Sequence, residues 1–332
     1  MWVDLFFIIS GFIIVHSTER KEHANPIDFS IRRFFRVVPL AQVMTLLYFV
    51  LTGCAASSKI FWRSMFFLPR ADMDPPKFGF PVLPPEWTLS YEIIFYCIFA
   101  AVLVVTHRWR VWAAILSIIA CVVGFQWALG GPISFYPKGV YLPTSYHGIV
   151  PPEILGQLGN PIMFEFVVGM VLAECYRRFE FVLRLPKFCF AERLIGLTLV
   201  GVFLASYFSN LDIEHGLLRK GSAAACLVIG ALLLEASYER PVAANASGGV
   251  FSFMLWVGTI SYSLYLVHFG IAEQIMLFLY RHSLAPRVTG IAGGVAMITL
   301  SLFLASLVHV FFERRIIGVG KFLIELRHKP DR

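Results

Sequence analysis

Nine long apolar segments constrain this chain more than any other feature of its sequence. They occupy residues 2–16, 36–52, 87–106, 111–129, 160–176, 194–209, 221–236, 256–280 and 288–312. A helix that crosses a bilayer needs about 20 mostly apolar residues, so several of these segments are near the short limit. Of the 332 residues, 58% are hydrophobic and 15% are charged, which excludes a soluble domain of this size. We therefore predict an all-α fold, a polytopic transmembrane bundle of about nine helices in one integral-membrane domain, residues 1–332.

The distribution of Lys and Arg predicts how the helices are oriented. If the C-terminal end of the first apolar segment faces the cytoplasm, 19 of the 28 basic residues lie in cytoplasmic segments. Such an excess is typical of cytoplasmic loops, so we expect a cytoplasmic C-terminus. The same loops account for the net charge of +7, and no nucleic-acid partner is expected. The six cysteines form no metal-ligand spacing with histidine, so neither a metal site nor a disulfide framework is predicted.

A single carboxylate, Glu92, lies inside the segment 87–106. A charge in hydrocarbon costs several kcal/mol unless it faces a polar cavity or a partner, so such residues are usually functional. Trp87 and Tyr91 flank Glu92 and are side chains typical of a membrane interface. The alternative is a carboxylate near the interface that reaches water or bonds to its neighbours.

Two other apolar segments carry single carboxylates. Asp4 is the only charge in the first segment, where it shares a helix face with Gly11, and Ser10-Gly11 allows a neighbouring helix to approach closely. The alternative is that Asp4 is exposed at the outer interface. Glu165 lies in the segment 160–176, and its alternative role is to pair with a cation at a helix end.

Arg33 and Arg36 follow the first segment and are three residues apart, which places them on one helix face. Two guanidinium groups so placed can grip a phosphate or pyrophosphate. The alternative is a basic anchor on the cytoplasmic side of the membrane.

Ser261, Tyr265 and His268 form a polar stripe on an apolar helix, because their spacing is i, i+4 and i+7. We expect His268 to be deep enough to need a partner or a wet cavity. The alternative is a structural histidine satisfied by one hydroxyl group. His309 and Glu313 are four residues apart, and we expect a helix-end contact between them.

Six motifs, in order, resemble those of the membrane acyltransferase-3 family. They include Val-Asp-Leu-Phe-Phe with Ser-Gly-Phe, Arg-x-x-Arg-x-x-Pro, Trp-Thr-Leu-Ser-Tyr-Glu and Ser-Tyr-Ser-Leu-Tyr-Leu-Val-His. The six lie at residues 3–12, 33–39, 87–96, 164–170, 260–268 and 311–314. The Tyr-Glu-x-x-Phe-Tyr form is most similar to the branch associated with exopolysaccharide production.

The resemblance implies a multi-pass enzyme of the bacterial inner membrane. Such an O-acyltransferase moves an acyl group, here acetyl, from cytoplasmic acetyl-CoA to a hydroxyl of a surface polysaccharide or lipid-linked sugar. Acetyl-CoA is then a co-substrate, and no bound cofactor is expected. Membrane lipids are the remaining partners.

The resemblance also implies roles for individual residues. Arg33 and Arg36 would bind the donor, Glu92 and Asp4 would orient the catalytic base or hold the acceptor, and His268 would line the acyl path. The acceptor and acyl path would further include Trp87, Tyr91, Ser261 and Tyr265.

In the family, ten helices are expected, and the catalytic histidine lies on the helix before the segment matched here by residues 2–16. We therefore expect that this first helix is missing and that the chain alone has little activity. Full activity would instead point to a base within the chain, with His268 as first candidate and His16 as second. A transporter or flippase and an inactive relative that acts in polysaccharide assembly are the alternative functions, although no internal symmetry supports the former.

Overall fold

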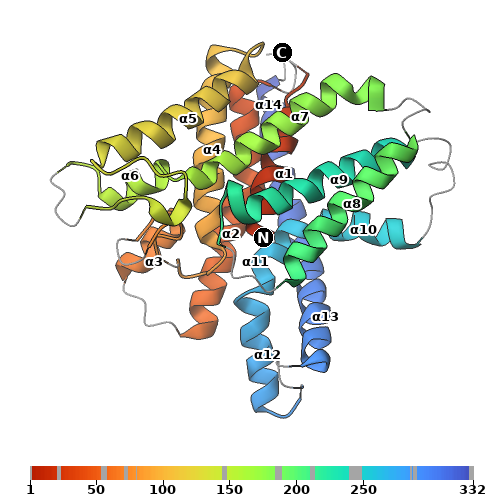
Figure 1. Cartoon of the computed structure of the whole chain (residues 1–332). Coiled ribbons are helices and arrows are strands. Elements are labelled where there is room, and N and C mark those ends of the chain that lie inside the picture. The colour runs from red at the N-terminus through yellow and green to blue at the C-terminus, as the bar shows by residue number, and fades with distance from the viewer. Residues whose placement is uncertain are drawn as a thin grey trace. The chain divides into compact units, whose positions relative to one another are not determined.

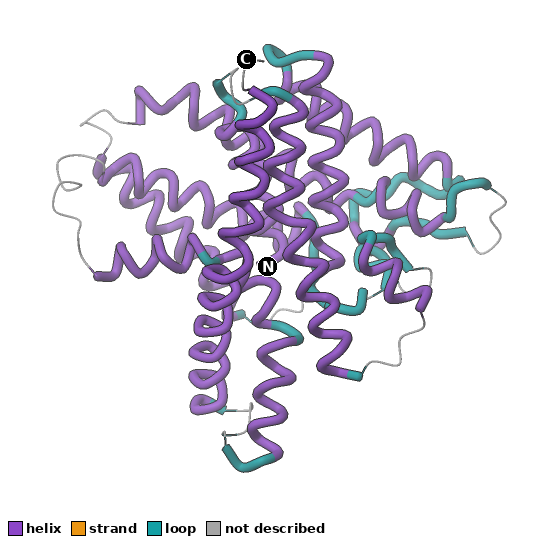
Figure 2. The backbone as a smooth tube through the Cα atoms, turned by 180° about the vertical axis from the view of Figure 1, so that it is seen from behind, coloured by secondary structure: helices purple, strands orange, loops and turns teal. Residues whose placement is uncertain are grey.

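The computed structural model describes residues 2–20, 24–53, 58–70, 74–79, 81–143, 148–183, 189–209, 214–238, 249–284, 286 and 290–328. The regular elements of this described part are all helical (Figures 1 and 2). They are α1 (Trp2–Ser17), α2 (Pro26–Thr52), α3 (Ser58–Met65), α4 (Glu86–Val105), α5 (Arg110–Ala128), η2 (Pro137–Gly139), α6 (Pro152–Leu158), η3 (Pro161–Met163), α7 (Phe164–Leu183), α8 (Cys189–Phe208), η5 (Leu217–Gly221), α9 (Ser222–Tyr238), α10 (Gly249–Thr259), α11 (Ser261–His268), α12 (Ile271–Arg281), α13 (Ile291–Val308), η7 (His309–Glu313) and α14 (Arg314–His328).

The predicted polytopic helix bundle is confirmed. Within the described ranges, seven helical stretches are long and apolar enough to cross a membrane. An eighth is the pair α11 and α12, which is bent by 50° at a short break. The first predicted span corresponds to α1, which has only 16 residues and is shorter than the usual bilayer helix.

Two helix boundaries differ from the expected spans because polar residues find partners inside the protein. Helix α2 begins at Pro26, ten residues before the predicted start, with Pro at its first position and Asp28 in its first turn. Asp28 is buried and pairs with Arg327 and with His328, whose Nε2 lies 2.7 Å from Oδ2. Helix α14 supplies both partners, so the last predicted span also continues as helix, to His328.

Two short helices lie between the predicted spans. Helix α6 falls within residues 130–159, which lack helical periodicity, and starts at Pro152 directly after another proline. Helix α3 lies between the second and third predicted spans. Both have eight residues or fewer, too few for a periodic pattern to stand out.

The chain forms two compact units. The first unit comprises Met1–Pro26, Asp74–Pro76 and Tyr91–Ser247, and the second comprises Ile27–Met73, Lys77–Ser90 and Gly248–Arg332. Helix α4 supplies its first five residues to the second unit and the remainder to the first.

In the first unit, α1 packs against α7 and α9, and α8 lies beside α9 (Figures 1 and 2). The α1–α7 contact reaches the backbone: a Cβ on Gly11 would lie 2.2 Å from the Phe166 carbonyl oxygen. A Cβ on Gly169 would lie 2.0 Å from the Ile8 carbonyl oxygen. The prediction that Gly11 admits a neighbouring helix is confirmed, since a side chain at either glycine would force the helices apart.

An aromatic cluster fills the core of the first unit. The Phe166 ring lies 4.7 Å from the Phe7 ring and 4.4 Å from the Phe95 ring, centroid to centroid. Tyr91 belongs to the same cluster, because its ring centroid lies 6.1 Å from that of Phe7. The Tyr91 hydroxyl donates a 2.6 Å hydrogen bond to the Pro76 carbonyl. Rings at these separations attract one another beyond simple burial, so the cluster fixes α1, α4 and α7 together.

In the second unit, α11 is anchored to α2 by the Tyr262 hydroxyl, which donates a 2.6 Å hydrogen bond to the Val37 carbonyl. The chain breaks after α11 at Gly270, whose φ of +103° favours glycine. A Cβ at this position would lie 3.1 Å from the Tyr48 ring and 3.2 Å from Leu83, so the packing also requires a small residue.

Candidate functional site

The predicted site residues fall into both units. Asp4, Tyr91 and Glu92 belong to the first unit. The second unit holds Arg33, Arg36, Trp87, Ser261, Tyr265 and His268. Each set is therefore described within its own unit.

Glu92 lies in the protein interior, with 3% of its surface exposed. The carboxyl oxygen Oε1 accepts a hydrogen bond from the Tyr96 hydroxyl, one turn later on α4. It also accepts one from the Ser10 hydroxyl of α1 at 3.3 Å. Glu92 is thus held by neighbouring hydroxyl groups and does not reach outward to water, and Ser10 is positioned by the close approach of helices at Gly11.

Asp4 is fully buried and binds the segment just before η5. Its Oδ2 lies 3.0 Å from His215 Nδ1, and its Oδ1 accepts a 3.3 Å hydrogen bond from the Gly216 amide. The alternative of an exposed interfacial Asp4 is contradicted by this burial. The sequence pattern did not single out His215, because a lone histidine in a loop 211 residues from its partner leaves no local signal.

Glu165 lies beside Asp4 in the same interior. Its carboxyl group acts electrostatically on that of Asp4, and its surface is 0% exposed. Among the described residues, neither oxygen makes a hydrogen bond of normal geometry, and no ion pair with a helix-end cation is seen. A Cβ on Gly221 would lie 3.1 Å from Glu165 Oε1, so this glycine leaves room for the carboxyl group.

Arg33 and Arg36 lie on α2, which already includes both residues, so the predicted spacing places them about one turn apart. Arg33 is half-buried, with its guanidinium carbon 5.6 Å from the centre of the Phe29 ring. Arg36 is exposed. At least Arg36 is therefore not covered by other described parts of the protein.

Two of the sequence motifs meet in the second unit. The Tyr265 hydroxyl of α11 donates a 3.0 Å hydrogen bond to the Pro85 carbonyl and is also hydrogen-bonded to the Thr88 hydroxyl. Trp87, between them in sequence, is buried with 7% of its surface exposed. The start of α4 and the polar stripe of α11 are thus joined directly.

The predicted polar stripe of α11 is divided. Tyr265 is half-buried, whereas Ser261 and His268 are exposed. Helix α11 ends at His268, where the next residue, Phe269, is extended, and the histidine is exposed at this helix end. Its Nδ1 lies 2.8 Å from the Tyr265 carbonyl and 3.1 Å from the Leu264 carbonyl. His16, at the end of α1, is exposed as well.

Two further buried carboxylates lie in the second unit. Glu86 begins α4 and accepts a hydrogen bond from the Thr45 hydroxyl. Its position at a helix start is so common for a carboxylate that the sequence carries no functional signal. The expected contact of Glu313 with His309 is confirmed at 2.8 Å, and the Ser263 hydroxyl donates to the same carboxyl oxygen at 2.5 Å.

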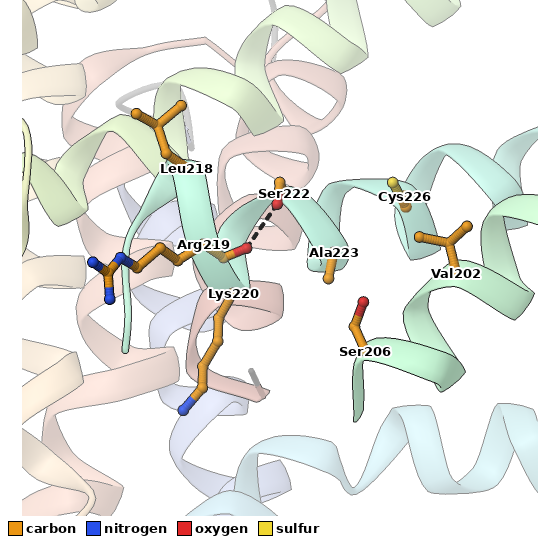
Figure 3. A pocket seen from close by; sticks show the side chains of 8 residues that line it. All are labelled: Val202, Ser206, Leu218, Arg219, Lys220, Ser222, Ala223 and Cys226. Atoms are coloured by element: carbon orange, nitrogen blue, oxygen red, sulfur yellow. Dashed lines mark hydrogen bonds between the residues drawn. The ribbon is translucent and has the colours of Figure 1, made fainter. Parts of the chain in front are cut away.

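A pocket of about 440 Å³ opens in the first unit beside η5 (Figure 3). Its lining comes from α8, η5 and α9 and comprises Val202, Ser206, Leu218, Arg219, Lys220, Ser222, Ala223 and Cys226. The guanidinium group of Arg219 contacts residues that do not line the pocket. Its Nη1 lies 3.4 Å from Glu214, and its central carbon lies 4.7 Å from the centre of the Tyr136 ring. The pocket is therefore mainly apolar, with hydroxyl groups and Lys220 as its other polar lining.

Comparison with known proteins points to one family. The sequence model of the acyltransferase-3 family, described as an acyltransferase domain, matches residues 1–307. The chain is 28% identical to the exopolysaccharide production protein ExoZ of Rhizobium meliloti, over 80% of this chain and 74% of that protein.

Two other relatives are more distant. The peptidoglycan O-acetyltransferase OatA of Listeria monocytogenes is 25% identical over 81% of this chain and 44% of its own length. The acyltransferase MdmB of Streptomyces mycarofaciens is 24% identical over 94% of this chain and 79% of its own length. No solved structure matches the chain.

Proposed function

Because the chain belongs to the acyltransferase-3 family and is a multi-pass membrane O-acyltransferase, we propose that it acetylates a hydroxyl of a cell-surface polysaccharide or lipid-linked sugar. The donor is cytoplasmic acetyl-CoA. The observation that carries this substrate class is the similarity to ExoZ over most of both chains, supported by the similarity to a peptidoglycan O-acetyltransferase.

The reaction needs a base. The acceptor oxygen forms a bond to the thioester carbonyl carbon, the carbon–sulfur bond breaks, and the hydroxyl proton must be removed as the attack proceeds. Asp4 and Glu92 are the carboxylates that would orient the base or hold the acceptor, and their burial among hydrogen-bond donors supports that role. His268 is exposed and would line the acyl path.

Arg33 and Arg36 would bind the phosphates of acetyl-CoA. Guanidinium groups form paired hydrogen bonds to phosphate oxygens, and the exposure of Arg36 supports access for a large, charged donor. Trp87, Tyr91, Ser261 and Tyr265 would form the acceptor and acyl path. The direct bonding of Tyr265 to the start of α4 supports a shared role for the two motifs.

We further propose that the protein lies in the bacterial inner membrane with a cytoplasmic C-terminus, where the excess of basic loops would face acetyl-CoA. Residues 1–332 would act as one acyltransferase-like domain, as the extent of the family match supports.

The test uses membrane vesicles from the source cells, which contain the protein as those cells make it, with radiolabelled acetyl-CoA and the surface polysaccharide of the same cells. We expect label to appear in the polysaccharide as an alkali-labile ester. Arg36→Ala should abolish most of it, whereas Arg108→Ala, at an exposed arginine outside the motif, should not. Absence of ester label above protein-free vesicles, with acetyl-CoA and polysaccharide both present, contradicts the proposal.

A further inference from the structure

Helices α2 and α14 of the second unit contact each other and run in opposite directions. A Cβ on Gly320 would lie 2.8 Å from the Phe35 Cβ, so the two helices approach closely at this point. Further along α14, Arg327 pairs with Asp28, which lies before Phe35 on α2. The step from the first contact to the second is equally long on both helices and opposite in sense, so it fixes their register.

This register places Lys321 and Arg36 on the same side of the helix pair. Each directly follows a contact residue, Gly320 on α14 or Phe35 on α2. One residue along a right-handed helix is a turn of about 100°, and in an antiparallel pair that turn directs both residues to the same side. With a rise of about 1.5 Å per residue, Lys321 and Arg36 differ by only about 3 Å in height along the pair.

The opposite side of the same helix pair is apolar. Exposed apolar residues mark it: Phe34 on α2, and Val319, Leu323 and Leu326 on α14. Apolar residues exposed on membrane helices suit contact with lipid chains, whereas charged residues face water or a polar interior. The side that carries Lys321 and Arg36 is therefore suited to a polar ligand.

Both cations are available to such a ligand. Arg36 and Lys321 are exposed, and neither makes a hydrogen bond or an ion pair in the part of the chain that the structure describes. Glu325, one turn after Lys321 on α14, is likewise not paired with it. Two positive charges on one side of a helix pair repel each other and attract an anion that binds between them.

A phosphorylated donor matches this side better than a lipid headgroup does. A headgroup is held beside its own acyl chains, but the exposed apolar residues of this helix pair lie on the other side. Acetyl-CoA carries a pyrophosphate and a further phosphate on its ribose, all of them remote from the acetyl group. Guanidinium binds a phosphate through paired hydrogen bonds and lysine binds it as a point charge, so the two suit neighbouring phosphates.

We propose that Lys321 is a further donor-binding residue, which binds the phosphates of acetyl-CoA together with Arg36. The inference rests on the proposed function and extends its donor site from α2 to α14. Helix α14 lies beyond residues 1–307, which the family model matches, so Lys321 belongs to none of the matched motifs. Gly320 is the residue that brings α14 close enough for the two cations to act on one ligand.

The test measures equilibrium binding of acetyl-CoA to the protein, purified from the source cells and placed in nanodiscs of phosphatidylcholine, a lipid without net charge. Lys321→Ala should lower the affinity about tenfold, because one charge-assisted contact is lost. Lys321→Arg should restore most of it, because the positive charge is kept. S-acetylpantetheine, a donor without phosphate, should bind equally to Lys321→Ala and to the unaltered protein.

The matched control is Arg315→Ala. Arg315 is another exposed cation of α14, and its position five residues before Gly320 directs it away from α2. This variant should bind acetyl-CoA as the unaltered protein does. An equal loss of affinity in Arg315→Ala and Lys321→Ala would reflect the overall charge of α14 and would overturn the inference.

Three further results would count against the proposal. Unchanged acetyl-CoA affinity in Lys321→Ala overturns the inference, and the proposed function stands if Arg36→Ala weakens binding. An equal loss with S-acetylpantetheine assigns Lys321 a structural role and overturns it too. If phosphatidylglycerol stabilises the unaltered protein but not Lys321→Ala, while acetyl-CoA affinity is the same, the residue binds a lipid headgroup instead. Absence of acetyl-CoA binding by the unaltered protein contradicts the proposed function itself, and the inference falls with it.

Discussion

The charged residues of the predicted site differ in exposure between the two units. In the first unit, Asp4, Glu92 and Glu165 are buried, and the first two are hydrogen-bonded to hydroxyl, imidazole and amide groups. In the second unit, Arg36 and His268 of the predicted site are exposed. Buried acids suit proton transfer, because a dry site strengthens their effect, whereas exposed cations suit the capture of a large phosphorylated donor. We therefore propose a division of roles, with acid–base chemistry in the first unit and donor binding in the second.

The strongest test of this division is Glu92→Gln. Glutamine keeps the size of the side chain and can still accept from the Ser10 and Tyr96 hydroxyls, but it has no charge. We expect transfer to fall about 10²-fold or more with the protein amount in the membrane unchanged. Tyr96→Phe, which removes one donor only, should lose less. A transfer rate in Glu92→Gln equal to that of the unaltered protein would show that the charge of Glu92 takes no part in the reaction.

The donor half of the comparison is tested by Arg33→Ala and Arg36→Ala. Hydrogen bonds to charged groups contribute about 1.5–3 kcal/mol, so acetyl-CoA affinity should fall roughly ten- to hundredfold. Arg→Lys should restore only part of it, because an ammonium lacks the paired geometry of guanidinium. Equilibrium binding of acetyl-CoA to the purified protein gives the values. Equal affinity in both alanine variants and in the unaltered protein would make these residues membrane anchors.

The enclosure of the first unit is tested at the α1–α7 contact. Gly169→Ala places a Cβ 2.0 Å from the Ile8 carbonyl oxygen, and forced overpacking costs about 1–3 kcal/mol. The unfolding temperature in detergent should drop. Gly124→Ala on α5, where nothing lies within 4 Å of the added carbon, should leave it unchanged or raise it. Similar unfolding temperatures for both variants would show that α1 and α7 separate easily.

The smallest effect is expected for His268→Ala. Its ring is exposed, and loss of one polar contact typically costs about 0.5–1.5 kcal/mol, so transfer should fall about two- to tenfold. Initial rates at saturating acetyl-CoA measure the change. A loss of 10²-fold or more would place acid–base chemistry in the second unit and contradict the proposed division.

Local patterns predicted much of the fold and part of the site. The apolar segments predicted the helix bundle, Ser10-Gly11 predicted the close helix contact, and the spacing of Arg33 and Arg36 placed them on one helix face. These features depend on residues within a few turns of one another. Asp4 and His215 could not be paired in this way, because their contact depends on how α1, α7 and α9 pack. The exposure of His268 likewise follows from the end of α11 before Gly270, which the continuous apolar segment 256–280 does not predict.

The order of synthesis gives the Asp4–His215 contact a further consequence. The ribosome adds about 5–20 residues per second, so Asp4 emerges roughly 10–40 s before His215, its partner 211 residues later. Helix α7, which receives Gly11 of α1, also comes late in the chain. For most of that interval α1 has neither the imidazole nor the helix that enclose its carboxylate in the finished protein. The packing of α1 against α7 and α9 can therefore be completed only after α9 has been synthesised, late in translation of the chain.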